Sequence, residues 1–319
     1  MKALVYTGVR TLDYIDVPDP TNDTIVRVEA VGICGSDMHA WAGHDDRRPA
    51  PLILGHEAAG TTADGRRVTI NPLVTCGTCE ACRTGRDNLC STRAIISMPP
   101  REGAFAEMVG MPERNLVEVP QGVSFAKASL AEPIACGWHA VRLAAAALDR
   151  PLDQARCLVM GGGAIGLGAA LVLAAHGAKE ITIAETNPAR RAAITGPFTL
   201  IDPRETALPT VDLVIDGVGF SATRAAASAA VRPGGVIAHI GLGDARDGLD
   251  IRRMTLQEIT FIGTYTYTMQ DFRDTAAAIF DGRLGPLDWP EERALKDGAQ
   301  AFEDIAAGDV AAPKIVLHP

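Results

Sequence analysis

The sequence has no apolar run of the length that a membrane-spanning helix needs, and its formal net charge of −9 comes without a basic stripe. Its first residues, MKALVYTG, lack the apolar core and the small-residue cleavage site of a secretory signal. These absences argue against membranes and nucleic acids as partners. We therefore expect a cytoplasmic protein whose partners are small molecules.

At 319 residues the chain is too long for one ordinary hydrophobic core, so about two domains are expected. Residues 1 to about 120 contain short β-branched runs, at 3–8, 25–32 and 66–72, which turn residues separate. This pattern predicts an all-β body for the first part of the chain.

From about residue 137, alanine-rich stretches alternate with apolar runs such as CLVM, EITIAE, VDLVIDGVG, GGVIAHIGL and ITFIGTYTY. This alternation is typical of βαβ units around a buried parallel sheet, so the fold class is α/β with two domains. The boundary lies near residues 132–141. The tail from about residue 286 contains a predicted helix, QAFEDIAAG, and a predicted strand, PKIVLHP, which can rejoin the first part.

Four of the seven cysteines fall within the short segment CGTCEACRTGRDNLC. Thiolates are soft ligands, and four of them in one loop are typical of a closed structural zinc site. The alternative, a set of unrelated buried cysteines, requires this clustering to arise by chance. We therefore expect one zinc ion that stabilises the fold and offers no position to a substrate, with the ligands Cys76, Cys79, Cys82 and Cys90.

A glycine-rich turn, GGGAIGLG, follows the apolar strand CLVM and opens a helix. Its glycines have the spacing of a dinucleotide-binding turn, and Glu185 ends the next predicted strand. The helix N-terminus would offer N–H donors and a partial positive charge to a pyrophosphate. The residues expected to contact the cofactor are Gly161, Gly163, Ala164, Ile165, Gly166, Glu185, Arg190, Val218 and Gly219.

Glu185 can accept hydrogen bonds from both ribose hydroxyls and would repel a 2′-phosphate, so NAD is favoured over NADP. Arg190 and Arg191 lie close enough in the sequence to weaken this inference, and the alternative for Glu185 is an exposed charge at a strand end. The helix that follows is expected to begin with Asn187 as its N-cap and to be short, which would leave the adenine side of the site more open.

Cys34 has no neighbouring cysteine but lies in the polar segment VGICGSDMHAWAGH. His56 and Glu57 follow in LGHEAAG, and Glu132 precedes a proline between the two parts of the chain. One cysteine, one histidine and one carboxylate with an open fourth position make a catalytic zinc set. Taken singly, each residue has an ordinary structural explanation. Two further cysteines lie in apolar settings and are expected to act as small hydrophobes: Cys136 and Cys157.

The order of motifs resembles the medium-chain, zinc-dependent alcohol dehydrogenase family, in its sorbitol, threonine and polyol dehydrogenase branch. The motifs are GICGSDMHAW, LGHEAAG, the four-cysteine loop, GAFAEMV, LAEPIACGWHA, GGGAIGLG, VIDGVG and PKIVLHP. The resemblance implies a GroES-like β-rich catalytic domain, 1–137 plus 286–319, and a Rossmann cofactor domain, 138–285, with the active site in the cleft between them. It also implies two zinc ions per chain.

By this resemblance, Cys34 and His56 bind the catalytic zinc, and either Glu57 or Glu132 supplies the carboxylate. Where Glu57 is the direct ligand, Glu132 acts through a bound water, and the two are expected to exchange roles during turnover. Zinc lowers the pKa of a bound alcohol, and a serine and a histidine then carry the proton through the cofactor ribose to solvent. The implied catalytic residues are Ser36, His39 and Glu57.

Other residues near Cys34 have simpler expected roles. Asp37 is expected to be structural or ion-paired, and His44 to lie in a solvated loop. Trp41 is expected either to line the pocket or to pack in the β domain. Three further histidines are expected to be helix or sheet residues with no catalytic duty: His139, His176 and His239.

The leading hypothesis is a zinc-dependent, NAD-linked dehydrogenase of polyols, sugar alcohols or related secondary alcohols. The low aromatic content of 5% and the glutamate-containing metal site suit a hydroxyl-rich substrate. The alternatives are a zinc-free quinone or enoyl reductase, an NADP-linked alcohol or aldehyde reductase, and a catalytically silent nucleotide- and zinc-binding regulatory protein. The family resemblance also implies a homodimer or homotetramer, for which residues 260–268 would supply an apolar sheet edge.

Overall fold

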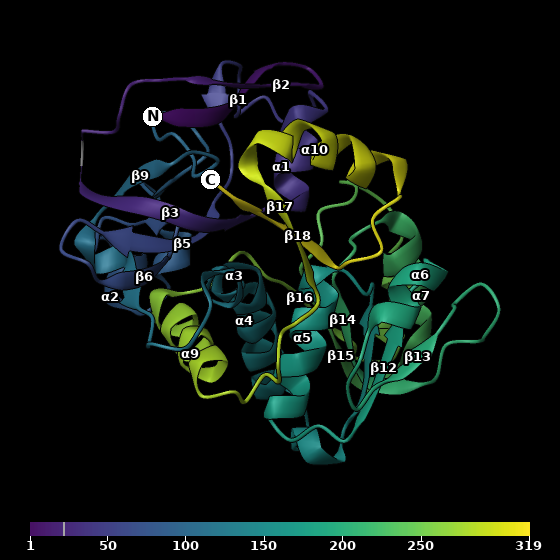
Figure 1. The fold of residues 1–319 in the computed structure, drawn as a ribbon. Helices are drawn as coiled ribbons and strands as arrows, with labels where there is room; N and C mark the ends of the chain where they lie inside the picture. Colours follow the sequence, from purple (N-terminus) through teal and green to yellow (C-terminus); the bar gives the residue numbers. More distant parts are fainter. Residues whose placement is uncertain (22) are drawn as a thin grey trace. The chain divides into compact units, whose positions relative to one another are not determined.

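The computed structural model describes residues 1–21 and 23–319, and the chain divides into two compact units (Figure 1). Unit 1 consists of Met1–Glu132 and Thr268–Pro319, and unit 2 consists of Pro133–Tyr267. None of the helices formed by the described residues has the length and apolarity required to cross a membrane.

Unit 1 is rich in strands, as its short β-branched runs predict. The strands are β1 (Lys2–Gly8), β2 (Thr11–Asp16), β3 (Thr24–Gly32), β4 (Leu52–Ile53), β5 (Glu57–Thr62), β6 (Arg67–Ile70), β7 (Leu73–Val74), β8 (Ala94–Ile95), β9 (Met108–Met111), β10 (Leu116–Glu118), β17 (Pro290–Ala294) and β18 (Lys314–His318). The main sheet has the order β10-β6-β5-β3-β18-β17, with β9 also paired to β3. A smaller sheet has the order β2-β1-β4, and β7 pairs with β8. The C-terminal strand β18 therefore pairs with β3, a strand near the N-terminus of the chain.

The helices of unit 1 are α1 (Gly35–Trp41), α2 (Glu80–Arg83), α3 (Phe125–Ser129), α9 (Met269–Phe280) and α10 (Gly298–Ala307). Aromatic rings fill the core beneath α10, where Phe302 contacts Phe105 edge to face with ring centroids 5.9 Å apart. Trp41 packs on the same phenylalanine at 5.8 Å. This contact anchors the end of α1, the helix that follows Cys34.

The unit boundary at residue 267 differs from the predicted domain boundary at residue 285 by the helix α9. This helix belongs to unit 1, because the amide of Met269 donates to the Asp87 carboxylate at 3.1 Å and Phe280 packs beside Ala128. The apolar pattern of α9 predicts a helix but does not specify the sheet against which it packs.

Unit 2 contains a parallel sheet with the order β13 (Thr199–Ile201), β12 (Glu180–Ala184), β11 (Arg156–Met160), β14 (Val211–Asp216), β15 (Val231–His239) and β16 (Thr260–Gly263). Every residue of β14 is buried, as expected for a strand covered on both faces. The helices are α4 (Ala131–Ala147), which begins at the unit boundary, α5 (Ala164–Ala175), α6 (Pro188–Ala193), α7 (Ser221–Ala230) and α8 (Ile251–Leu256). The strand order is that of doubly wound dinucleotide-binding folds, so the predicted fold class is confirmed.

The short helix α6 begins as the sequence predicts. The side chain of Asn187 accepts hydrogen bonds from the amides of Ala189, at 2.9 Å, and Arg190, at 3.1 Å. Pro188 occupies the first helical position, where its missing N–H costs nothing. The helix ends at Ala193, so the connection between β12 and β13 contains only this short helix of 6 residues.

Candidate metal centre and cofactor site

Two groups of potential metal ligands occur among the described residues, and both lie in unit 1. In the first group, ligand atoms of Cys34, His56 and Glu57 lie within 4.8 Å of one another. Antiparallel pairing places Gly32, at the end of β3, opposite Glu57, at the start of β5. The residues just beyond these two strand ends therefore meet, although they are far apart in the sequence.

Asp37 orients the buried imidazole of His56. His56 Nδ1 lies 3.4 Å from Asp37 Oδ1 and 3.3 Å from Ser97 Oγ. Asp37 is fully buried, and its other oxygen accepts the amide of Cys34 at 3.0 Å. Burial favours the neutral acid, but His56 and Arg48 hold the pKa of Asp37 below its usual value. The structural role predicted for Asp37 is confirmed, and His56 Nε2 is the nitrogen left available to a ligand.

The carboxylate of Glu57 has one paired oxygen and one unpaired oxygen. Oε1 accepts from the buried ammonium of Lys314 at 2.6 Å, and the same ammonium donates to the carbonyl of Ile33 at 2.8 Å. Oε2 is buried and has no hydrogen-bond partner among residues 1–21 and 23–319. It lies 2.1 Å from the position of a Cβ at residue 32, so the glycine there leaves it room. Buried polar atoms are nearly always bonded, so this oxygen beside a thiol and an imidazole fits a bound zinc ion.

Glu132, the other candidate carboxylate, lies buried in the first turn of α4. It is not part of the group of three, but it lies near Lys314. Burial alone would lower the pKa of Lys314, yet Glu57, Cys34 and Glu132 together raise it above its usual value. The lysine therefore stays charged, and the geometry favours Glu57 as the carboxylate closest to Cys34 and His56.

Ser36 and His39 share one face of α1, because they are three positions apart on the helix. Ser36, two residues after Cys34, is half-buried, and His39, one turn further along the helix, is exposed to water. The carbonyl of Ser36 accepts a hydrogen bond of 2.7 Å from the buried Arg48, which fixes this part of the helix.

Two neighbours of α1 have structural positions. Trp41 is buried in the core against Phe302, and the guanidinium of Arg10 lies over its ring. Of the two roles expected for Trp41, the structure therefore shows packing in the β-rich unit. His44 is exposed in the turn after α1, as expected.

The second group of potential ligands is the four-cysteine loop. Its sulfur atoms lie within 4.8 Å of one another, and all four thiols are free of disulfides. The amides of Thr78 and Cys79 point to the sulfur of Cys76, at 3.4 and 3.3 Å. The Thr78 amide and hydroxyl lead the contacts that hold the pKa of Cys76 below its usual value. Amide donors that stabilise a thiolate fit the soft ligands of a closed zinc site, here Cys76, Cys79, Cys82 and Cys90.

The glycine-rich turn joins β11 to α5 in unit 2. Gly161 has a φ of +91°, and a Cβ at Gly166 would lie 1.9 Å from the Gly161 carbonyl, so both positions require glycine. A Cβ at Gly161 would also lie 2.6 Å from the side chain of Val218, which borders the turn together with Gly219. Apart from Gly163 itself and its two chain neighbours, no heavy atom of residues 1–21 and 23–319 lies within 4 Å of the Cβ position of Gly163, the N-cap of α5. A ligand can approach the backbone there and reach the first turn of the helix, which holds the predicted contacts Ala164 and Ile165.

Glu185 is fixed against the glycine-rich turn rather than exposed. Its carboxylate accepts the amides of Gly162, at 2.8 Å, and Asn187, at 2.7 Å, and its side chain is buried. The guanidinium of Arg190 lies 3.7 Å from the same carboxylate. Each carboxylate oxygen has capacity for a further hydrogen bond, so Glu185 can still accept from a ribose.

Sequence reasoning missed Lys314 and Ser97. A lysine that opens an apolar strand, as Lys314 does in KIVLH, is a signal, because a buried charge needs a partner. Ser97 lies in an irregular segment with no pattern around it, and only the fold brings it to His56.

Comparison with known families gives two matches that together cover much of the chain. Residues 20–121 match the alcohol dehydrogenase GroES-like domain, and residues 164–281 match the zinc-binding dehydrogenase family. The chain is 31% identical over 292 residues to L-galactonate-5-dehydrogenase of Escherichia coli K12, covering 84% of each protein. It is 33% identical over 296 residues to sorbitol dehydrogenase of Bacillus subtilis, covering 84% of this chain and 82% of that protein.

A solved structure of a reductase is also similar to this chain over its whole length. The acetophenone reductase of Geotrichum candidum, in complex with NAD, superposes with a TM-score of 0.88 at 26% identity, covering 100% of this chain and 97% of that one. The predicted enzyme class, an oxidoreductase of alcohols, is thereby confirmed. The chain belongs to the medium-chain, zinc-dependent alcohol dehydrogenase family, in the branch that includes sorbitol and other polyol dehydrogenases.

Proposed function

We propose that this protein transfers hydride between a polyol, or a related secondary alcohol, and NAD. The observation that carries the proposal is the group of Cys34, His56 and Glu57, with the buried and unpaired Oε2 of Glu57 among them. The relatives named for L-galactonate and sorbitol support a hydroxyl-rich substrate.

Cys34, His56 and Glu57 would hold the catalytic zinc, and the four-cysteine loop would hold a second, structural zinc. Zinc in such an open site supplies Lewis-acid chemistry, which lowers the pKa of an alcohol hydroxyl towards neutrality. Asp37 keeps His56 in position, and Lys314 keeps Glu57 in place. Glu132, buried nearby, would act through a water molecule.

Ser36 and His39 would carry the proton that leaves the alcohol. Ser36 has a hydroxyl that both accepts and donates, and it lies two residues after Cys34. His39 is exposed on the same helix face, where its imidazole can pass a proton to water. The cofactor ribose would link the two side chains.

The cofactor would lie at the carboxyl ends of β11 and its neighbours, on the residues predicted from the sequence. The N-terminus of α5 would receive the pyrophosphate, and Glu185 would accept from the ribose. The buried negative charge of Glu185 disfavours a 2′-phosphate, which supports NAD over NADP. Arg190 offsets only part of that charge, at 3.7 Å.

We also propose a homodimer or homotetramer assembled through β16, the edge strand of the parallel sheet. Phe261 and Ile262 on this strand are only half-buried within one chain, and an apolar sheet edge favours pairing with a second copy. The cytoplasmic location expected from the sequence stays a prediction.

The direct test follows the absorbance of reduced nicotinamide when the zinc-loaded protein meets a panel of polyols and simple secondary alcohols, each with NAD and with NADP. We expect turnover of at least one polyol, with a higher kcat/KM for NAD than for NADP. Ser36→Ala should lower kcat about a hundredfold, because a positioned proton acceptor is lost, whereas His44→Ala should have no such effect. Silence across the panel, or preference for NADP, would contradict the proposal.

A further inference from the structure

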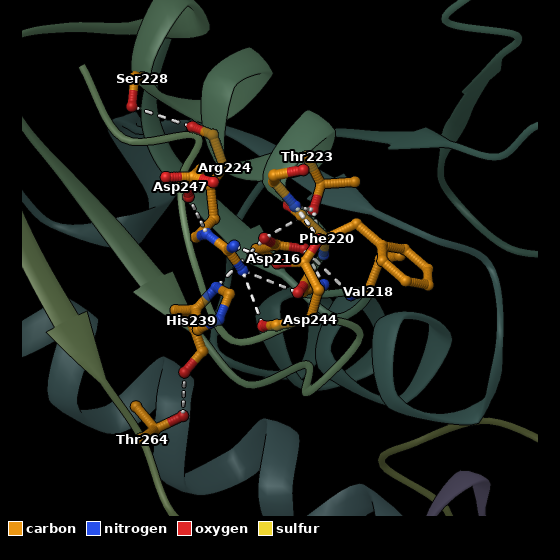
Figure 2. Close-up of polar contacts among 12 residues, drawn as sticks. Asp216, Val218, Phe220, Thr223, Arg224, Ser228, His239, Asp244, Asp247 and Thr264 are labelled. Carbon is orange, nitrogen blue, oxygen red and sulfur yellow. Dashed lines mark hydrogen bonds and ion pairs between the residues drawn. The ribbon is translucent and has the colours of Figure 1, made fainter. Parts of the chain in front are cut away.

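Asp216, the last residue of β14, is a buried carboxylate that gathers hydrogen bonds from the turn after its strand (Figure 2). Its Oδ1 accepts the amides of Val218, at 3.0 Å, and Gly219, at 2.9 Å. Its Oδ2 lies 2.9 Å from the hydroxyl of Thr223, in the first turn of α7. The side chain therefore fixes the turn that borders the glycine-rich turn.

His239, the last residue of β15, completes this set of contacts. Its Nδ1 lies 3.1 Å from Asp216 Oδ2 (Figure 2). Its ring packs beside that of Phe261, with ring centroids 5.5 Å apart. Its carbonyl accepts both the amide and the hydroxyl of Thr264, just after β16, at 2.9 and 3.0 Å. His239 thus links the carboxyl ends of three neighbouring strands.

The charge of Asp216 makes the histidine contact important. Burial favours the neutral acid, but the contact with His239 and the amides of Gly219 and Val218 hold the pKa of Asp216 below its usual value. The carboxylate is therefore ionised at neutral pH, and a buried ion that loses one of its donors is strongly destabilised. Without His239, the turn would have to rearrange to satisfy it.

The turn has no room to rearrange without moving the cofactor site. A Cβ at Gly161 would lie 2.6 Å from Val218, and a Cβ at Gly217 would lie 3.1 Å from the amide of Gly166. On the other side, a Cβ at Gly219 would lie 2.1 Å from the carbonyl of Gly241. The turns after β11, β14 and β15 are therefore stacked in direct backbone contact. Dinucleotides bind immediately outside these strand ends.

We propose that His239 is a positioning residue for the cofactor: its Nδ1 donor holds Asp216, and Asp216 holds the Val218–Gly219 turn against the glycine-rich turn. The proposal rests on the proposed function, because the ligand is a nicotinamide dinucleotide. His239 acts through Asp216 and is not itself a catalytic residue, which agrees with the expectation from the sequence.

Substitutions at position 239 distinguish the effect of the Nδ1 hydrogen-bond donor from the effect of losing the imidazole ring. His239→Asn keeps a nitrogen donor near the position of Nδ1, His239→Gln carries its donor near the position of Nε2, and His239→Leu has none. The measurements are the Kd of NADH from its fluorescence on binding, together with kcat and the KM values for NAD and for the alcohol. We expect His239→Leu and His239→Gln to raise the Kd of NADH about tenfold and the KM for NAD with it, while the KM for the alcohol stays unchanged. His239→Asn should remain within about threefold of the wild type.

A matched control is His176→Leu, at the end of α5, whose Nδ1 contacts a carbonyl one turn earlier in its own helix. This variant should bind NADH as the wild type does. If His239→Leu fails to fold, the Kd values of the Asn and Gln variants for NADH still test the role of the Nδ1 donor. The role proposed for His239 would be overturned if the Gln and Leu variants bound NADH with the wild-type Kd, or if the Asn variant bound NADH as weakly as they do. Either result would leave the proposed function standing. A wild-type protein that does not bind NADH would instead overturn the proposed function, and this proposal with it.

Discussion

Lys314 places a buried positive charge 2.6 Å from the Glu57 carboxylate, in the interior of unit 1. A buried carboxylate that loses the lysine paired with it keeps the penalty of desolvation. The lysine therefore matters for the stability of the candidate metal centre as well as for the position of Glu57.

We predict that, in protein stripped of zinc, Lys314→Met lowers the free energy of unfolding by about 3 to 5 kcal/mol, measured by denaturant unfolding. The double variant Glu57→Gln/Lys314→Met should recover most of this loss, because no unpaired charge then remains. Lys127→Met is the control: Lys127 pairs with Asp288 on the surface, and its loss should cost less than about 1 kcal/mol. Equal losses in the two lysine variants would contradict the importance assigned to the buried pair.

Single residues could be predicted from the sequence where a local motif defines them. The four-cysteine loop and the glycine-rich turn are such cases, because their spacing reflects a local geometry. Cys34 and His56 lie far apart in the sequence, and the resemblance to a known family, rather than a local spacing, singled them out. The choice between Glu57 and Glu132 could not be made this way. It depends on the register of β3 with β5, which places Glu57 opposite Gly32, and registers between distant strands leave no local pattern.

Among the secondary-structure elements, β16 has a sheet edge that the described part of unit 2 does not cover with another strand. Phe261 and Ile262 are partly exposed on it, and unpaired backbone groups with apolar side chains favour association. The sequence predicted this strand and its apolar character, because its alternation is local. It could not assign α9 to unit 1, because that depends on contacts with residues such as Asp87, which are far away in the sequence.

We predict that multi-angle light scattering gives the wild-type protein at least twice the 33.5 kDa of one chain. Ile262→Lys should shift the protein to the mass of a single chain, because a charge on the edge strand opposes pairing. Leu256→Lys, at an exposed apolar position on α8, should leave the assembly intact. A monomeric wild type, or an Ile262→Lys variant that assembles normally, would rule out β16 as the interface.

In the whole molecule, each unit carries one half of the proposed chemistry: unit 1 contains both groups of potential metal ligands, and unit 2 contains the proposed dinucleotide site. The sequence predicted this division because the zinc-ligand motifs fall in the strand-rich part and the glycine-rich turn falls in the βαβ part. The doubly wound strand order was also predictable, since alternating strands and helices have few stable arrangements. The buried networks that support the two sites, around Lys314 and His239, were not predictable, because each joins residues from distant segments.

The measurement that tests the account most directly is the zinc content of the purified wild type and of Cys34→Ser, taken together with their dehydrogenase activity. The account predicts two zinc ions per wild-type chain, one in Cys34→Ser, and loss of activity in the variant, because Cys34 would hold only the catalytic ion. A Cys34→Ser protein that keeps full activity, or a wild type that is active with the four-cysteine zinc alone, would contradict it.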